Sequence, residues 1–135
     1  MILKQKTSAG LETLLPDSAP VISLGDDNSV FTNLAASLAE IRKLKGVMGY
    51  ILRSDTSAII DLIGQEKIIE YAVLSSQISE SSIEMAIQFN MTDLESVLVE
   101  GKSVKVLCMS VSVNRISVFM EKTAPHTGII QRILL

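Results

Sequence analysis

The sequence is poor in the residue types that metal sites and disulfide scaffolds need. Its 135 residues include one cysteine, one histidine and no tryptophan. A single cysteine, Cys108, excludes an intramolecular disulfide, and its place in an apolar strand pattern indicates a small core residue. His126 has no second histidine or cysteine nearby at metal-ligand spacing. We therefore predict no metal site and no cofactor.

The net charge and the length of the hydrophobic runs argue against nucleic acids and membranes as partners. The chain has 12 basic and 15 acidic residues, a net charge of −3, and only two tyrosines and three phenylalanines. Nucleic-acid binding uses a basic surface and aromatic stacking platforms, which this composition does not supply. The apolar runs fall far short of the roughly 20 residues of a membrane-spanning helix, and no hydrophobic signal core begins the chain. We expect a soluble, cytoplasmic protein.

The strongest pattern in the sequence is a β-hairpin over residues 102–122. Val104, Val106 and Cys108 alternate with residues that point to the opposite face, and β-branched residues continue the alternation after a turn around Val113 to Arg115. Both faces of the hairpin are apolar, whereas a strand exposed on one side keeps one polar face. We predict a central hairpin with helices on both sides of the sheet.

The remaining periodic segments predict a single domain over residues 28–135, preceded by a loosely ordered extension over residues 1–27. Residues 28–45 and 65–90 have helical spacing, and a short helix follows Pro125. Residues 46–53, 57–63 and 94–100 have the composition of strands. The predicted fold class is an α/β (α+β) sandwich, a five-stranded mainly antiparallel sheet between helices in the order αββαβββα.

The helix predicted over residues 65–90 has apolar residues on two opposite faces. At about 100° per residue, Tyr71, Leu74, Ile78, Met85 and Phe89 form one stripe, and a second stripe lies roughly opposite. One stripe can cover the sheet, so the other needs a second partner. An alternative breaks the helix near residue 79 and restarts it with a capping box, but the absence of glycine and proline favours an unbroken helix.

A free strand edge beside this helix predicts a homodimer with two-fold symmetry. An edge strand at residues 94–100 leaves backbone groups unpaired, and joining two copies there satisfies them and brings the two long helices together. The predicted interface consists of Ile69, Val73, Ser76, Ile83, Ile87, Leu94, Ser96, Val97, Leu98 and Val99.

The order of elements resembles the Roadblock family, which comprises dynein light-chain and GTPase-regulator proteins with a profilin-like sandwich. The resemblance covers about residues 28–134 and rests on Leu44-Lys45-Gly46-Val47-Met48-Gly49, the turn at Asp55, Glu70-Tyr71-Ala72 and the three closing strands. It implies a non-catalytic dimer, joined through the third strand and the long helix, that serves small Ras-like GTPases or motor and signalling assemblies. It also implies that another Roadblock-type protein can replace the second copy.

No motif in the chain indicates an enzyme. The serines lie in no nucleophile-elbow pattern, and the segment from Gly46 to Gly49 begins a strand, where a phosphate-binding loop would end one. Two other functions remain open at this stage: a longin-like trafficking adaptor and a monomeric small-ligand sensor. The sensor requires a concave pocket with several convergent polar groups.

Overall fold

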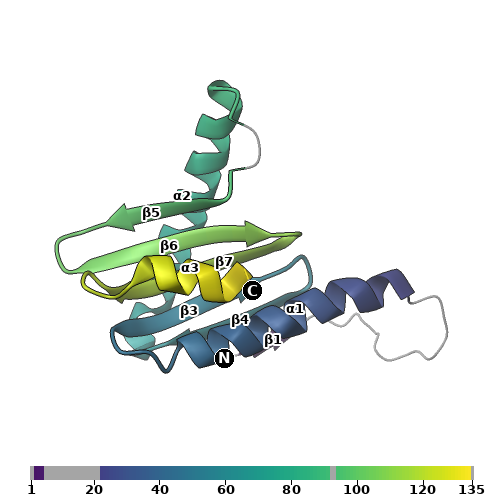
Figure 1. The fold of residues 1–135 in the computed structure, drawn as a ribbon, viewed down its shortest axis with the longest axis horizontal. Coiled ribbons are helices and arrows are strands. Elements are labelled where there is room, and N and C mark those ends of the chain that lie inside the picture. Colours follow the sequence, from purple (N-terminus) through teal and green to yellow (C-terminus); the bar gives the residue numbers. More distant parts are fainter. Residues whose placement is uncertain (1, 5–21, 92–93, 135) are drawn as a thin grey trace.

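A six-stranded antiparallel sheet lies between helices on its two faces (Figure 1). The computed structural model describes residues 2–4, 22–91 and 94–134. The strands are β1 (Ile2–Lys4), β3 (Val47–Arg53), β4 (Ser57–Leu62), β5 (Ser96–Glu100), β6 (Val104–Val111) and β7 (Asn114–Glu121). The helices are α1 (Ile22–Ile41), α2 (Ile68–Gln88) and α3 (His126–Leu134), with a 3-10 turn, η1 (Gln65–Lys67), before α2.

The order of strands across the sheet is β1-β4-β3-β7-β6-β5, and all neighbours are antiparallel. The five predicted strands are therefore confirmed, with β6 and β7 in the interior and β5 at one edge. Short strand β1 adds a sixth strand beside β4, within the segment predicted as an extension. Residues 5–21 of that segment lie outside the described residues.

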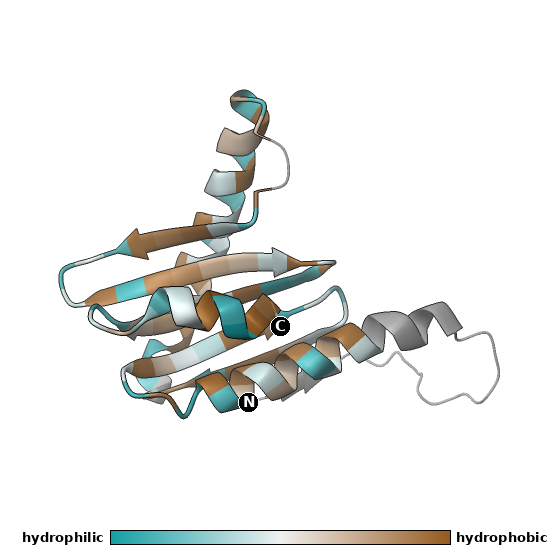
Figure 2. Cartoon of the chain, viewed as in Figure 1, coloured by the Kyte–Doolittle hydropathy of each residue, from teal (hydrophilic) through white to brown (hydrophobic). Residues whose placement is uncertain are grey.

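The two faces of the sheet have separate hydrophobic cores, as the alternation in the hairpin predicts. Helices α1 and α3 cover one face, where Leu38, Leu52, Val118 and Ile129 are almost completely buried. Helix α2 covers the other face. Figure 2 shows the hydrophobic residues, in brown, running along the central strands between these layers.

The core under α2 is small and centres on Phe119 of β7. Its ring stacks on the ring of Tyr71 of α2, with centroids 4.5 Å apart and planes 6° from parallel. Ile51, Val106 and Cys108 complete the buried cluster. Contacts of this type hold the first half of α2 on the sheet.

Helix α1 has different ends from those predicted. The sequence predicts a helix over residues 28–45, with Asn28 or Ser29 as its cap after Asp26 and Asp27, but α1 begins at Ile22 and runs through these polar residues. At its other end α1 stops at Ile41, and i→i+3 hydrogen bonds such as Leu44 N to Ile41 O continue the chain as tight turns.

Candidate protein-interaction surface

Helix α2 is longer than the sheet that it covers. Its 21 residues extend about 31 Å, whereas four spacings between strands β4 and β5 amount to about 19 Å. The second half of α2 therefore passes β5 and projects beyond the edge of the sheet (Figure 1). The structure confirms the unbroken helix and places its last turns beyond the edge of the sheet.

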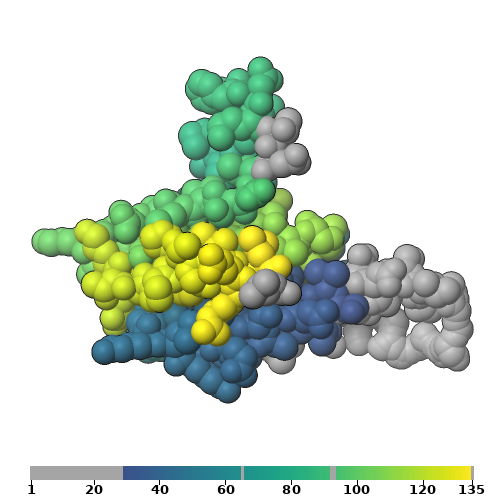
Figure 3. Space-filling view, viewed as in Figure 1, coloured from purple at the N-terminus to yellow at the C-terminus, as the bar shows by residue number. Residues whose placement is uncertain are grey.

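This projecting end of α2, defined here as residues 83–91, is rich in exposed apolar side chains. Figure 3 shows it as a column of side chains standing above the rest of the molecule. Ile87 is 73% exposed and Phe89 is 71% exposed, which is unusual for side chains of this size on a monomer. The exposed large apolar residues of the projecting end are Ile83, Met85, Ile87, Phe89 and Met91.

The projecting end is a well-formed helix terminus. Asn90 adopts a positive φ of 56°, and the backbone N–H of Met91 donates to the carbonyl oxygen of Ala86 at 2.8 Å. This six-to-one hydrogen bond closes the last turn, and asparagine tolerates the left-handed conformation that such a cap requires. The apolar side chains are thus presented on a capped helix.

Strand β5 lies next to this helix and forms the free edge of the sheet. It pairs with β6 on one side, with Val97 opposite Cys108 and Val99 opposite Val106. No described strand pairs with its other side. Because Val97 and Val99 share the face of Cys108 and Val106, they lie on the same side of the sheet as α2.

The structure brings only part of the predicted interface together within one subunit. Ile83, Leu94, Ser96 and Val97 line one small cavity of about 40 Å³ between α2 and β5. Ile69, 79% exposed, lies near the start of α2, about 27 Å along the helix from Ile87. The other predicted residues have these positions: Val73 and Val99 are exposed, and Ser76 and Leu98 are half-buried.

The sheet covers only the first part of the stripe that contains Tyr71. Met85 and Phe89 belong to the same predicted stripe, but both are exposed because the sheet ends before they are reached. Comparing the length of the helix with the width of the sheet identifies both residues as exposed. Met91, which follows the helix, was also missed.

Two serines of α2 lie between the helix and the sheet. Ser75 and Ser82 are both buried on the side that faces the sheet. Their hydroxyls donate to backbone carbonyls of the same helix, Ser75 Oγ to Ala72 O at 3.1 Å and Ser82 Oγ to Ser79 O at 3.0 Å. They let α2 lie close to its own sheet.

Burial raises the pKa of two side chains among the described residues, Tyr50 and Cys108. At Cys108 a hydrogen bond with Ser117 partly opposes this effect. His126 Nδ1 lies 2.9 Å from Lys105 Nζ at the start of α3, which ties the helix to β6.

Within residues 2–4, 22–91 and 94–134, no three histidine, cysteine, aspartate or glutamate side chains are grouped to hold a metal ion. No helix in these ranges is both long and apolar enough to cross a membrane.

The arrangement of strands and helices is that of the Roadblock/LC7 fold, as the sequence predicts. The chain is similar to the structure of a Roadblock/LC7 domain from Streptomyces avermitilis, with a TM-score of 0.60 and 14% identity over 78% of this chain and 87% of that one. It is also similar to the gliding protein MglB from Thermus thermophilus, with a TM-score of 0.60 and 11% identity over 77% and 82% of the two chains. MglB of Myxococcus xanthus gives 0.56 and 16% over 77% and 88%. No protein-family model and no curated protein matches the sequence.

Proposed function

We propose that this chain is a non-catalytic, homodimeric scaffold or regulator of a small Ras-like GTPase, or of a motor or signalling assembly. The observation that carries the proposal is the apolar projecting end of α2 beside the unpaired edge of β5. Exposing Ile87 and Phe89 to water on a monomer is unfavourable by roughly 1.5–3 kcal/mol for each such side chain. A second copy of the chain would cover the exposed apolar side chains of α2 and pair the free edge of β5 at the same time.

The geometry of such a dimer follows from two-fold symmetry. Antiparallel pairing of two β5 strands continues the sheet from one subunit into the other, and the two α2 helices then run antiparallel on the same face. Ile83 lies beside β5, so it is close to the two-fold axis of such a dimer, and Ile87 and Phe89 of each helix then extend over the sheet of the partner subunit.

The choice of a GTPase or an assembly as partner is supported by the fold. The Roadblock resemblance implies platforms for small Ras-like GTPases, and the similar structures include a protein named for gliding. A dimer with a continuous sheet gives such a partner a broad rigid surface. We place this activity in the cytoplasm.

Light scattering behind a sizing column tests the dimer directly. We expect a mass of twice 14.6 kDa for the wild-type protein at low micromolar concentration. Ile87→Glu changes a side chain that is 73% exposed in the subunit, so it should leave folding intact and weaken the dimer. Two buried glutamates per dimer should raise the dissociation constant by about 100-fold or more.

Two further variants sharpen this test. Val97→Asp should weaken the dimer from the β5 side. Ile63→Glu is the matched control, because Ile63 is also an exposed apolar residue but follows β4, away from the projecting end. A monomeric wild-type protein, or equal masses for Ile87→Glu and the wild type on dilution, would contradict the proposed interface.

The partner is tested with purified Ras-like GTPases of the source organism, loaded with GDP or with a non-hydrolysable GTP analogue. We expect binding that depends on the nucleotide and is lost with the monomeric Ile87→Glu variant, while Ile63→Glu still binds. Equal binding of both nucleotide states would argue against a regulator and favour a scaffold. Failure of every GTPase to bind would refute the GTPase part of the proposal.

A further inference from the structure

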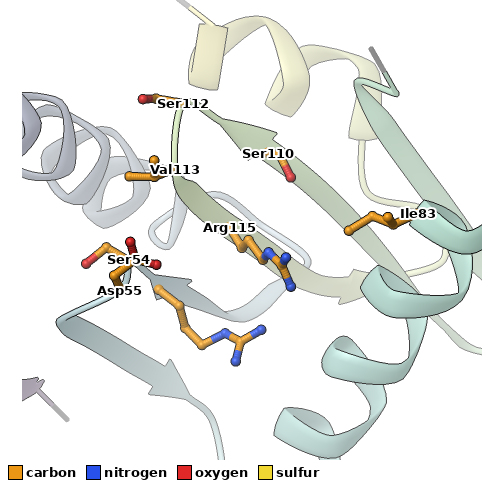
Figure 4. Close-up of a pocket in the computed structure, with 8 residues that line it drawn as sticks. Ser54, Asp55, Ile83, Ser110, Ser112, Val113 and Arg115 are labelled. Carbon is orange, nitrogen blue, oxygen red and sulfur yellow. The ribbon is translucent and has the colours of Figure 1, made fainter. Parts of the chain in front are cut away.

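A polar pocket of about 440 Å³ opens on the α2 face of the sheet (Figure 4). It lies where the β3–β4 turn, the β6–β7 turn and α2 meet, and Ser54, Asp55, Ser110 and Arg115 are among its walls. Its volume falls in the range of sites for small molecules, roughly 300–1,000 Å³. Several polar groups converge on it, which is the feature that a ligand-binding site needs.

Two arginines dominate the charge of this pocket. Arg53 of β3 and Arg115 of β7 are direct partners in the sheet register, so their side chains leave the same face of the sheet. Like charges opposite each other on neighbouring strands are destabilising. Among the described residues, neither arginine takes part in an ion pair. An anion bound between the two guanidinium groups would relieve this repulsion.

The turns that frame the pocket are held in place by their own hydrogen bonds. Ser54 Oγ accepts from the backbone N–H groups of Thr56 at 3.3 Å and Ser57 at 3.1 Å. On the other side, Asn114 Nδ2 donates to the carbonyl oxygen of Val111 at 3.2 Å. Fixed walls reduce the ordering that a ligand must impose, which favours binding.

We propose that this pocket binds a small phosphorylated molecule through Arg53 and Arg115. A guanidinium group donates two parallel N–H bonds to a phosphate or carboxylate, and two such groups around a tetrahedral phosphate use more of its oxygens than they would of a planar carboxylate. Ser110 is the register partner of Arg115 on β6 and adds a hydroxyl donor. Val113, in the β6–β7 turn, is an apolar wall for the organic part of the ligand, and Ile83 of α2 lies on the opposite side of Arg115 (Figure 4).

The charge balance of the pocket supports a small ligand. Asp55 is the one carboxylate among the described residues of the walls, so the pocket carries a net positive charge while the whole chain has a net charge of −3. An overall negative protein repels long polyanions but leaves room for one phosphate at a local positive site. Arg53, Ser110 and Arg115 lie outside the predicted dimer interface, so phosphate binding by these residues does not require the dimer.

Titration calorimetry with two probes, inorganic phosphate and phenyl phosphate, tests the pocket against sodium chloride of matched ionic strength. We expect saturable binding of phosphate with a dissociation constant in the millimolar range, and at least about tenfold tighter binding of phenyl phosphate because its ring contacts Val113. The same titration of the Ile87→Glu variant separates this site from dimerisation. We expect that variant to bind both probes like the wild type.

Charge-removing variants assign the binding to this pocket. Arg53→Gln and Arg115→Gln should each weaken phenyl phosphate binding by at least about tenfold. Arg132→Gln removes one positive charge from the exposed face of α3 and is the matched control, with binding expected to stay within about twofold. Without phosphate, the two pocket variants should melt no earlier than the wild type, because the arginine repulsion is relieved.

Three results would overturn the proposal. The first is no saturation with either probe up to about 20 mM, beyond which a site has no useful affinity. The second is unchanged binding in Arg53→Gln and Arg115→Gln. The third is an equal loss in Arg132→Gln, which would show that the probes respond to net charge alone.

Discussion

Replacing Gly49 by alanine should destabilise this protein strongly, because β3 and β4 approach each other closely at that position. The register of β3 against β7 shifts between Val47 and Gly49, so the strand has an irregularity there. On its other side Gly49 is the register partner of Leu62 in β4. A Cβ atom at Gly49 would overlap the carbonyl oxygen of Asp61 and would lie 2.6 Å from Leu62 Cα and 2.7 Å from Leu62 Cδ2.

The size of the effect follows from these distances. Carbon atoms in favourable contact are about 3.5–4.0 Å apart, so the backbone of β4 would have to move away by about 1 Å. Overpacking of a core usually costs about 1–3 kcal/mol, and the opposing atoms here belong to backbone that is fixed by sheet hydrogen bonds. We therefore expect Gly49→Ala to lower the free energy of unfolding by about 3 kcal/mol. For a domain of this size that is a fall in melting temperature of about 10 °C.

Urea unfolding followed by circular dichroism measures this change, with all variants at one protein concentration because a dimer's stability depends on concentration. Gly128→Ala is the matched control. Gly128 lies within α3, and a Cβ there would meet nothing within 4 Å. Alanine favours a helix over glycine by about 0.5–1 kcal/mol, so this variant should be more stable than the wild type. A loss below about 1 kcal/mol for Gly49→Ala would refute the argument from close approach.

Two further predictions concern the core under α2. Phe119→Ala removes the ring that stacks on Tyr71 and should lower the free energy of unfolding by about 3–5 kcal/mol. Helix α2 should also lose its hydrogen-exchange protection early in this variant. Full protection of α2 would contradict the role given to the stacked rings. Because burial raises the pKa of the Cys108 thiol, little thiolate forms at pH 8, and Ellman's reagent should react with Cys108 slowly in the native protein and rapidly in urea. Equal rates in the two conditions would refute this.

The sheet could be predicted from the sequence because the residue pattern within each strand shows which side chains face which side. In β6 and β7, successive side chains point to opposite faces and most are apolar, and in the structure they lie in the two separate cores as expected. Val118 and Phe119, neighbours in sequence, lie in different cores for this reason. A period of two allows only one division of the residues between the faces, so no knowledge of distant contacts was needed.

The ends of helices were harder to predict because the competing signals are weak. A favourable cap at Asn28 is worth about 1 kcal/mol, and contacts elsewhere along a helix easily exceed this amount. The pairing of β1 with β4 was beyond sequence reasoning for another reason. Three residues have too little periodicity to identify a strand, and the partner, Ser57 to Ile59, is more than fifty residues away.

The arginine pocket was not found from the sequence, although both arginines are visible in it. Arg53 ends one strand and Arg115 lies at the start of another, and each by itself is an ordinary charged residue at a turn. Only the pairing of β3 with β7 makes them neighbours. Sites built from distant segments of a sheet therefore depend on strand order and register, neither of which local periodicity determines.

The exposure of Met85 and Phe89, which belong to the same stripe as Tyr71, has a more general cause. Helical periodicity indicates which residues are buried in the functional assembly, but it does not say which surface buries them. Tyr71 and Phe89 point in nearly the same direction from α2, yet the first stacks on Phe119 and the second lies past the edge of the sheet. A stripe that continues beyond the end of its own sheet requires a second surface at the same height. The projecting end of α2 and the free edge of β5 are adjacent, so one partner that continues the sheet would cover both, and a second copy of this chain has the matching edge and helix.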